Sequence, residues 1–513
     1  MSNQTKYDAI IIGAGIGGLT CGNILAKNGL RVLILEKNPF PGGAVSTFYK
    51  NGYPVDITHS ICGLNKGSFI NKLFDYLDLT ENLDSRKLAK AFIHISANDN
   101  KHFYSFTDIE KYQNDLCNYY PHERKGIQKL FQVMSIIWDK EILRSYYNPN
   151  IAILSTYPFV FPNLAKYQHY TFEQFLSKFV KDPALIDVIS VGWPYIGLEQ
   201  SKVSALYMIC IIMAYHKEGS YFIKGGFGKI PRILEHNFIR LGGNIIYDTE
   251  VTNIIFSNKK IAQGVKISTG NSYSAVNVIS NADTIKTFND LIGNKNLSFR
   301  LRNKIQKNRL SCSAVQIHLV VKAQIPAEYL DTGSIIMKSQ ITILNQSKNC
   351  TLVISIHKTS DFLLSETKDL YIINILCLPV DYPSWEDCQN LNNDVYETAK
   401  KTVALQTYDN FKKLFSFEQL ISYNVLTPLS FSKWLHATGG AVYDIETSPD
   451  QMLLQRFNNL KPIKNLFCVG AKSFPGPGIA GALCSSVSVA DMILKGQLTR
   501  GKFVLNNYGR KFN

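Results

Sequence analysis

Three glycines near the N-terminus have the type and spacing that could hold a nucleotide phosphate. They lie in the run Gly13-Ala14-Gly15-Ile16-Gly17-Gly18, which follows the apolar stretch 7–12 and opens an apolar helical stretch, 16–28. In such a turn Gly13 permits the sharp bend, Gly15 lets a pyrophosphate approach the backbone, and Gly18 lets the helix pack closely on the sheet. Free N–H groups at a helix start attract negative charge. The run therefore predicts a dinucleotide site.

A carboxylate stands where such a site needs one. After the helix-ending Gly29, residues 31–35 read as a second strand, and Glu36 closes it. An acid about 20 residues beyond the glycine turn can accept hydrogen bonds from ribose hydroxyls and repels a 2′-phosphate. The alternative is a glycine turn in an α/β protein that binds nothing. Strand, turn, helix, strand and acid in sequence favour the dinucleotide.

Two further glycine stretches could approach the same ligand. Gly42-Gly43 follows the acid and either brings backbone to a bulky ligand or forms a plain hairpin turn. Near the C-terminus the expected strand 465–470 leads into the glycine loop 474–482, and a helix with a small-residue face follows. This second strand, glycine loop and helix start offers another positive helix end to a ligand.

Between the two glycine loops the pattern changes twice. Residues 66–220 read as helices and loops rich in aromatic side chains, which could build an apolar cavity or a core. Residues 222–283 read as short alternating strands that return to the first domain. Residues 291–449 mix strands and helices. The strands expected in these blocks include 250–255, 261–266, 277–283, 313–321 and 370–378, and a helix is expected at 393–414.

Length and composition limit the class of protein. The 513 residues suffice for about two or three domains, and 45% apolar residues indicate a globular chain. The formal net charge of +15 favours anionic partners. The charged residues are scattered along the chain and form no basic arm, so we expect no nucleic-acid partner. An anionic membrane surface suits the excess of positive charge better.

Cysteine usage and apolar runs predict a cytoplasmic protein. Ten cysteines show no C-x-x-C spacing, which is typical of reduced core residues. The N-terminus enters the first strand without a charged and then apolar leader, which argues against a secretory signal. The longest apolar run, Val203 to Tyr215, is shorter than the roughly 20 residues that span a bilayer. We therefore expect no transmembrane helix, and peripheral membrane association stays open.

Together these pieces resemble the superfamily of FAD-dependent enzymes that contains phytoene desaturases, carotenoid isomerases and retinol saturases. The resemblance covers nearly the full length and is most specific at both ends. It is carried by the first glycine run with Gly42-Gly43, by Lys224-Gly225-Gly226-Phe227-Gly228, and by Val469-Gly470 with Pro475-Gly476-Pro477-Gly478-Ile479-Ala480-Gly481. It implies an α/β fold, with a Rossmann-like FAD-binding domain of the glutathione reductase type and a discontinuous mixed α+β substrate domain.

The resemblance also implies domain boundaries and cofactor contacts. The FAD-binding domain would take residues 1–65, 222–290 and 456–495, the substrate domain 66–221 and 291–455, and a basic tail 496–513. The FAD phosphates would sit at the first helix, the adenosine ribose on Glu36, the adenine beside the strand at Val251, and the flavin ring on Gly478-Ile479. The implied cofactor-binding residues are Gly13, Gly15, Ile16, Gly17, Gly18, Glu36, Lys37, Gly42, Gly43, Val251, Gly470, Gly478 and Ile479.

Two departures leave the branch of the superfamily open. Ala44 follows the paired glycines where desaturases usually carry Arg, and Asp56-Ile57-Thr58 replaces their Asp-x-Gly. The histidines show no H-E-x-x-H spacing and no G-x-S-x-G elbow occurs, so we expect no metal and no separate nucleophile. Candidate side chains near the flavin ring are His59, Trp434, His436 and Tyr443. For each of them a packing or supporting role is favoured over acid–base work.

The expected function is an FAD-dependent oxidoreductase that desaturates, isomerises or saturates carbon–carbon bonds of an apolar polyene, carotenoid or retinoid-like substrate at flavin N5. The electron donor or acceptor stays open. One alternative is a flavin amine oxidase or protoporphyrinogen oxidase, but these usually place an acid where Ala471 follows Gly470. Another is a flavin-free lipid escort protein like the Rab GDP-dissociation inhibitors, whose glycine fingerprint is eroded, whereas this one is intact.

Overall fold

The computed structural model describes residues 7–96, 101–143, 157–343, 346–362, 369–380, 382–412, 415–452, 456 and 463–495. The expected basic tail, 496–513, lies outside the described residues.

A parallel sheet forms the centre of the first layer. Its order is β10-β2-β1-β13-β19, with Ala9 beside Val32 and Val278 beside both Ile10 and Leu466. The central strands β1 and β2 are short, and most of their residues are buried on both faces, as parallel strands covered by helices should be. Their bounds are β1 Tyr7–Ile12, β2 Val32–Leu35, β10 Asn244–Ile246, β13 Ser272–Ser280 and β19 Leu466–Cys468.

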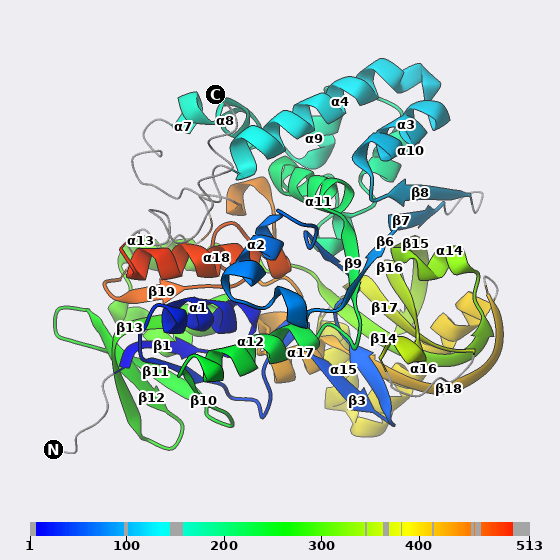
Figure 1. Cartoon of the computed structure of the whole chain (residues 1–513). Coiled ribbons are helices and arrows are strands. Elements are labelled where there is room, and N and C mark those ends of the chain that lie inside the picture. The colour runs from blue at the N-terminus through cyan, green and yellow to red at the C-terminus, as the bar shows by residue number, and fades with distance from the viewer. Residues whose placement is uncertain are drawn as a thin grey trace.

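Three helices from distant parts of the chain cover one face of this sheet. α1 (Ile16–Lys27), α12 (Lys229–Arg240) and α18 (Gly478–Ile493) lie together in Figure 1 and share one apolar core with the strands. The other face packs on α13 (Phe299–Gln306) and the segment Lys286–Ile292. The sheet is extended by β12 (Ala262–Ile267), which pairs antiparallel with the first half of β13, and by β11 (Val251–Phe256), which pairs antiparallel with β12. The Rossmann-like α/β fold is thereby confirmed.

A second, mixed sheet has the order β18-β14-β17-β16-β15-β7-β8 and is antiparallel except where β7 meets β15. One face packs on α15 and α16 through side chains such as Ile317, Ile373 and Trp385. The alternate residues, including Gln316 and His318, point to the opposite face. The bounds are β14 Ser313–Gln324, β15 Thr332–Ile343, β16 Gln346–Lys358, β17 Leu370–Val380, β18 Ser416–Leu426, α14 Ala327–Leu330, α15 Tyr382–Leu391, α16 Asn393–Lys412 and α17 Pro428–Leu435.

The expectation of helices and loops alone for residues 66–220 was wrong. This segment also contains β6 (Ser85–Leu88), β7 (Lys90–Ile95) and β8 (His102–Phe106). In β7 Ala91, Phe92, Ile93 and Ile95 are buried, and the strand pairs with β15 from far along the chain. Smaller sheets join β3 (Thr47–Lys50) to β4 (Tyr53–Asp56), and β9 (Ser220–Ile223) to β5 (Ile61–Cys62) and β6.

Helices fill the rest of this segment and form the upper layer in Figure 1. The apolar run at Val203 forms α11 (Ala205–Lys217), which is buried along most of its length. Across the described ranges, no helix combines the length and apolarity that crossing a bilayer would need. The other helices are α2 Phe69–Tyr76, α3 Ile109–Tyr119, α4 Arg124–Ile136, α7 Tyr157–Val160, α8 Pro162–Tyr167, α9 Phe172–Leu176 and α10 Pro183–Ile189.

Candidate functional site

The first glycine turn brings the start of α1 against the sheet. Gly13 has a φ of +97°, a conformation that favours glycine. A Cβ on Gly18 would stand 2.1 Å from the carbonyl oxygen of Gly13, so only glycine permits this approach. Gly15 is the N-cap residue, and no side chain caps the helix start. The backbone N–H groups of the first turn therefore remain available to an anionic ligand.

Glu36 lies at the tip of β2, beside the glycine turn. Its carboxylate accepts hydrogen bonds from the backbone N–H of Ala14 at 2.7 Å and of Asn38 at 2.8 Å. The side chain is buried, and burial raises its pKa, although these backbone bonds act in the opposite direction. Neighbouring Lys37 donates to the carbonyl of Lys433. The acid is thus held in one orientation at the strand end, with lone pairs left for further donors.

The paired glycines pack directly on the first turn. The N–H of Gly42 donates to the carbonyl of Ala14 at 2.9 Å, and Gly42 forms an isolated bridge with Gly15. A Cβ on Gly43 would lie 3.6 Å from the Cα of Gly15. The hairpin alternative is excluded because the pair opens the short helical turn Gly43–Val45.

Hydrogen bonds from α18 connect the C-terminal glycine loop to the first one. The hydroxyl of Ser486 donates to the carbonyl of Gly17 at 2.7 Å, and Ser485 accepts from the N–H of Gly470 at 2.9 Å. α18 begins at Gly478, and no side chain caps its start. Two uncapped helix starts, separated by most of the chain, are therefore held together by the small residues of α18.

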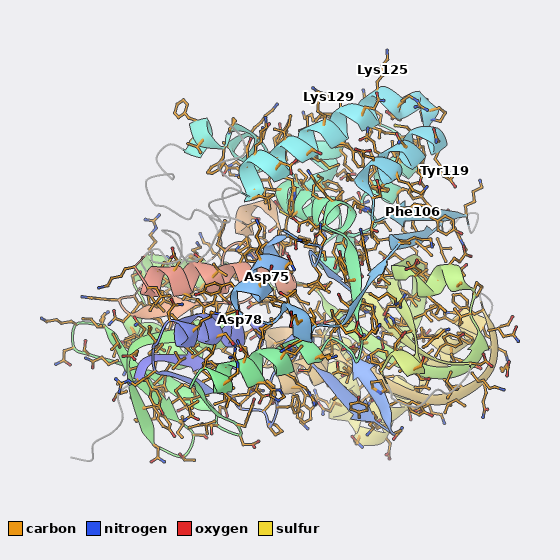
Figure 2. The ribbon with its side chains drawn as sticks, in the orientation of Figure 1. Asp75, Asp78, Phe106, Tyr119, Lys125 and Lys129 are labelled. Atoms are coloured by element: carbon orange, nitrogen blue, oxygen red, sulfur yellow. The ribbon has the colours of Figure 1, made fainter. Side chains whose placement is uncertain are left out.

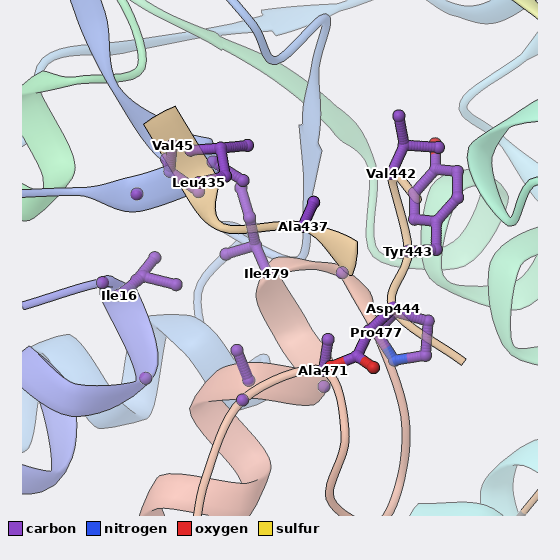
Figure 3. A pocket seen from close by; sticks show the side chains of 18 of the residues that line it. Ile16, Val45, Leu435, Ala437, Val442, Tyr443, Asp444, Ala471, Pro477 and Ile479 are labelled. Carbon is purple, nitrogen blue, oxygen red and sulfur yellow. The ribbon is translucent and has the colours of Figure 1, made fainter. Parts of the chain in front are cut away.

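Both helix starts open into one cavity of about 520 Å³, a volume typical of ligand sites. Figure 3 shows side chains from both loops converging there, with Ile16 from the first loop, Ile479 and Pro477 from the second, and Tyr443 from a third segment. The residues predicted to bind a cofactor line this cavity, apart from Gly18, which lies under the turn. The lining set is Gly13, Gly15, Ile16, Gly17, Glu36, Lys37, Gly42, Gly43, Val251, Gly470, Gly478 and Ile479.

The four candidate side chains also line the cavity, at two places. Trp434 and His436 lie at the C-terminal end of α17, where the carbonyl of Trp434 accepts from the side chain of Asn38 at 3.1 Å, near Glu36. His59 and Tyr443 lie deeper. The Nδ1 of His59 is 3.1 Å from the hydroxyl of Ser355, and burial lowers the pKa of His59 to about 3. The hydroxyl of Tyr443 donates to the carbonyl of Pro194 at 2.9 Å.

Sequence reasoning missed Asn281, whose amide lies among three glycines. A Cβ on Gly15, Gly17 or Gly470 would stand 2.7 Å from one of its side-chain atoms. The residue directly follows β13, and its N–H donates to the carbonyl of Ile12. The signal that could have found it is its place at the carboxyl end of a parallel strand, where ligands of α/β sheets bind.

Two residues of opposite charge, the half-buried Asp444 and the buried Lys472, were also missed. Asp444 lines the cavity with a φ of +62°, and among the described residues its Oδ1 has no hydrogen-bond partner. Burial and the charge of Asp283 raise the pKa of Asp444 to about 6, and the ammonium of Lys472 opposes this. Lys472 is itself buried and donates to the carbonyl of Ala282. No local pattern in the sequence singles out either residue.

The fold and this cavity define a dinucleotide-binding protein of the Rossmann type, and the comparisons with known proteins agree. A family described as NAD(P)-binding Rossmann-like domain matches residues 11–77. Putrescine oxidase bound to putrescine shares the fold, with a TM-score of 0.63 and 15% identity over 96% of this chain and 99% of that one.

Two known proteins are similar to this chain over most of its length. Prolycopene isomerase 1, chloroplastic, of an Oncidium hybrid cultivar is 27% identical over 506 residues, which cover 95% of this chain and 84% of the isomerase. Phytoene desaturase (lycopene-forming) of Pantoea ananas is 23% identical over 518 residues, covering 94% and 98% of the two chains. These similarities are consistent with the superfamily of phytoene desaturases, carotenoid isomerases and retinol saturases.

Proposed function

We propose that this chain is an FAD-dependent oxidoreductase that acts on carbon–carbon single or double bonds of an apolar polyene of the carotenoid or retinoid type. The observation that carries the proposal is one cavity that joins two uncapped helix starts and continues between apolar side chains such as Ile211, Leu376 and Phe431. The relatives whose names specify prolycopene and phytoene support the substrate class.

The residues at the cavity fit such a cofactor. The start of α1 at Gly15 would hold the phosphates, Glu36 the adenosine ribose, Val251 the adenine side, and Gly478-Ile479 the flavin ring. Segments 1–65, 222–290 and 456–495 would form the cofactor domain, and the segments between them the substrate domain. When bound, FAD supplies a hydride donor or acceptor. The chain's own contribution is to bind, orient and keep the reacting carbons dry.

The test uses the purified chain reconstituted with FAD and incubated with prolycopene or phytoene, with and without a reductant or an electron acceptor. We expect a flavin absorption band and a changed polyene spectrum. Product mass then names the reaction, because isomerisation leaves it unchanged, desaturation removes two hydrogens per step, and saturation adds two. A chain that retains no flavin and alters neither polyene under any condition would refute the proposal.

We further propose that Asp444 holds a hydroxyl of the cofactor's ribityl chain, since its Oδ1 lacks a partner among the described residues and it lines the cavity beside Ala471. Asp444→Asn should weaken FAD binding about 5-fold, because a charged hydrogen bond exceeds a neutral one by about 1 kcal/mol. Asparagine also tolerates the positive φ. Quenching of flavin fluorescence measures the dissociation constant.

The matched control is Asp369→Asn, which changes another positive-φ aspartate, exposed and away from the cavity. It should leave FAD affinity unchanged. Equal affinities for both variants and the unaltered chain would exclude Asp444 as a cofactor contact.

We also propose peripheral contact with an anionic membrane, where an apolar polyene would dissolve. The net charge of +15 supports it. Figure 2 shows Lys125 and Lys129 of α4 projecting away from the body of the molecule, and both are exposed. A reducing compartment such as the cytoplasm is proposed because all ten cysteines are free.

A further inference from the structure

Two of the polar side chains that line the cavity are deeply buried and incompletely hydrogen-bonded. His59 is 6% exposed and Gln316 is fully buried, and both line the cavity. Among the described residues, neither the Nε2 of His59 nor the Oε1 of Gln316 has a hydrogen-bond partner. We call these two side chains the polar end of the cavity.

The second sheet and the segment after β4 hold the polar end in place. The side-chain amide of Gln316 donates to the carbonyl of Asp56 at 3.4 Å, and the next inward-facing residue of β14, His318, lies 2.8 Å from the same oxygen. His59 follows Asp56 closely in sequence, and its Nδ1 meets the hydroxyl of Ser355 on β16. Both unpartnered atoms therefore belong to side chains that are anchored at their other polar atom.

A buried polar atom without a hydrogen-bond partner lowers the stability of the folded state. Leaving a buried donor or acceptor unpaired costs about 1–3 kcal/mol, and few such atoms occur in native proteins without a ligand, water or function. Burial keeps His59 neutral, so its ring has one donor and one acceptor nitrogen. When Nδ1 accepts from Ser355, Nε2 carries the hydrogen and donates. The polar end then offers one donor, from His59, and one acceptor, from Gln316.

We propose that the polar end binds a hydroxyl group of the substrate, so that the substrate is a polyene or isoprenoid alcohol. A hydroxyl accepts from His59 and donates to Gln316 at the same time, which satisfies both atoms. A carbonyl or ether could only accept, and a hydrocarbon would leave both unpaired. The hydroxyl would also fix how far the apolar chain enters the cavity. This inference rests on the proposed function, since it takes the cavity as the substrate site.

The test compares three ligands of equal chain length on the FAD-loaded protein: geranylgeraniol, its methyl ether, and the hydrocarbon in which hydrogen replaces the hydroxyl. Perturbation of the flavin absorption band reports binding. We expect the alcohol to bind about 10-fold more tightly than the hydrocarbon, which corresponds to two net hydrogen bonds, and the ether, which can only accept from His59, to bind with an affinity between the two. Gln316→Leu, of similar volume, should abolish the preference for the alcohol over the ether, and His59→Phe should reduce the preference for the alcohol over the hydrocarbon.

The control variant is Asn374→Leu. Asn374 is a buried polar residue on the same face of the sheet, and among the described residues its side chain also lacks partners, but it does not line the cavity. It should keep the preference for the alcohol. Equal affinity for all three ligands would mean that the polar end holds only water, and would overturn the inference while the proposed function stands. Weaker FAD binding by Gln316→Leu, with the ligand order unchanged, would also overturn it. A chain that holds no flavin would instead refute the proposed function.

Discussion

Gly18→Ala should weaken FAD binding by about 100- to 10,000-fold. The added Cβ would stand 2.1 Å from the carbonyl oxygen of Gly13 and 3.2 Å from the side chain of Ile11. Neither the turn nor the strand can yield without moving the start of α1. The backbone N–H groups of that first turn would then no longer point at the phosphates, and their hydrogen bonds to the phosphates would be lost. Two lost hydrogen bonds to a charged group amount to about 3–6 kcal/mol, and each 1.4 kcal/mol is tenfold in affinity.

The dissociation constant for FAD, measured by fluorescence quenching, checks this. Gly29→Ala is the matched control, because Gly29 ends the same helix at a φ of +84° with no atom within 4 Å of an added Cβ. It should destabilise the fold by about 1 kcal/mol through backbone strain alone and leave FAD affinity unaltered. If both variants hold FAD equally well, the close approach of α1 to the turn does not govern cofactor binding.

Asp56→Asn should remove a pH dependence of stability. The Asp56 carboxyl is buried and accepts from the N–H of Phe227 at 2.9 Å and from the hydroxyl of Thr47 at 2.7 Å, which joins β4 to the turn before α12. Burial raises its pKa to about 7, although both hydrogen bonds act in the opposite direction. In the unfolded chain an aspartate titrates near a pKa of about 3.9.

The number of protons bound in each state determines whether the stability contributed by Asp56 rises or falls with pH. Between pH 4 and pH 7 the folded state keeps a proton that the unfolded state releases, so this group's contribution to stability is fully present below about pH 4 and is lost as the pH rises. Three pKa units correspond to about 4 kcal/mol. An asparagine cannot ionise. The free energy of unfolding of Asp56→Asn should therefore rise relative to that of the unaltered chain by up to about 4 kcal/mol between pH 4 and pH 8.

Urea unfolding at several pH values measures this difference. Asp369→Asn, at an exposed position, should run parallel to the unaltered chain. Parallel curves for Asp56→Asn as well would show that Asp56 is not buried in a protonated form.

The sequence pattern was sufficient to predict those helices and strands whose stabilising contacts are local in the chain. β1, α1, β2 and Glu36 follow one another within 30 residues, and their order of apolar run, glycine turn and acid could be read directly. The same holds for the strand and glycine loop before α18. Strands β6 and β7 could not be found in this way, because pairing with β9 and β15, more than 100 residues away, stabilises them, and β8 completes the sheet by pairing with β7.

The amino-acid sequence by itself therefore determined the Rossmann-like class and the residues of both glycine loops, since these depend on turn geometry and helix starts. Only the tertiary structure decided that the two loops face one cavity, and that Asn281, Asp444, Lys472 and Gln316 line it. Gln316 lies on a strand, Asn281 and Lys472 follow strands, and Asp444 follows the helical turn Thr438–Gly440. Each gains its surroundings from partners distant in the chain. The physical reason is that a buried polar side chain is identified by what surrounds it, and the order of residues does not contain that information.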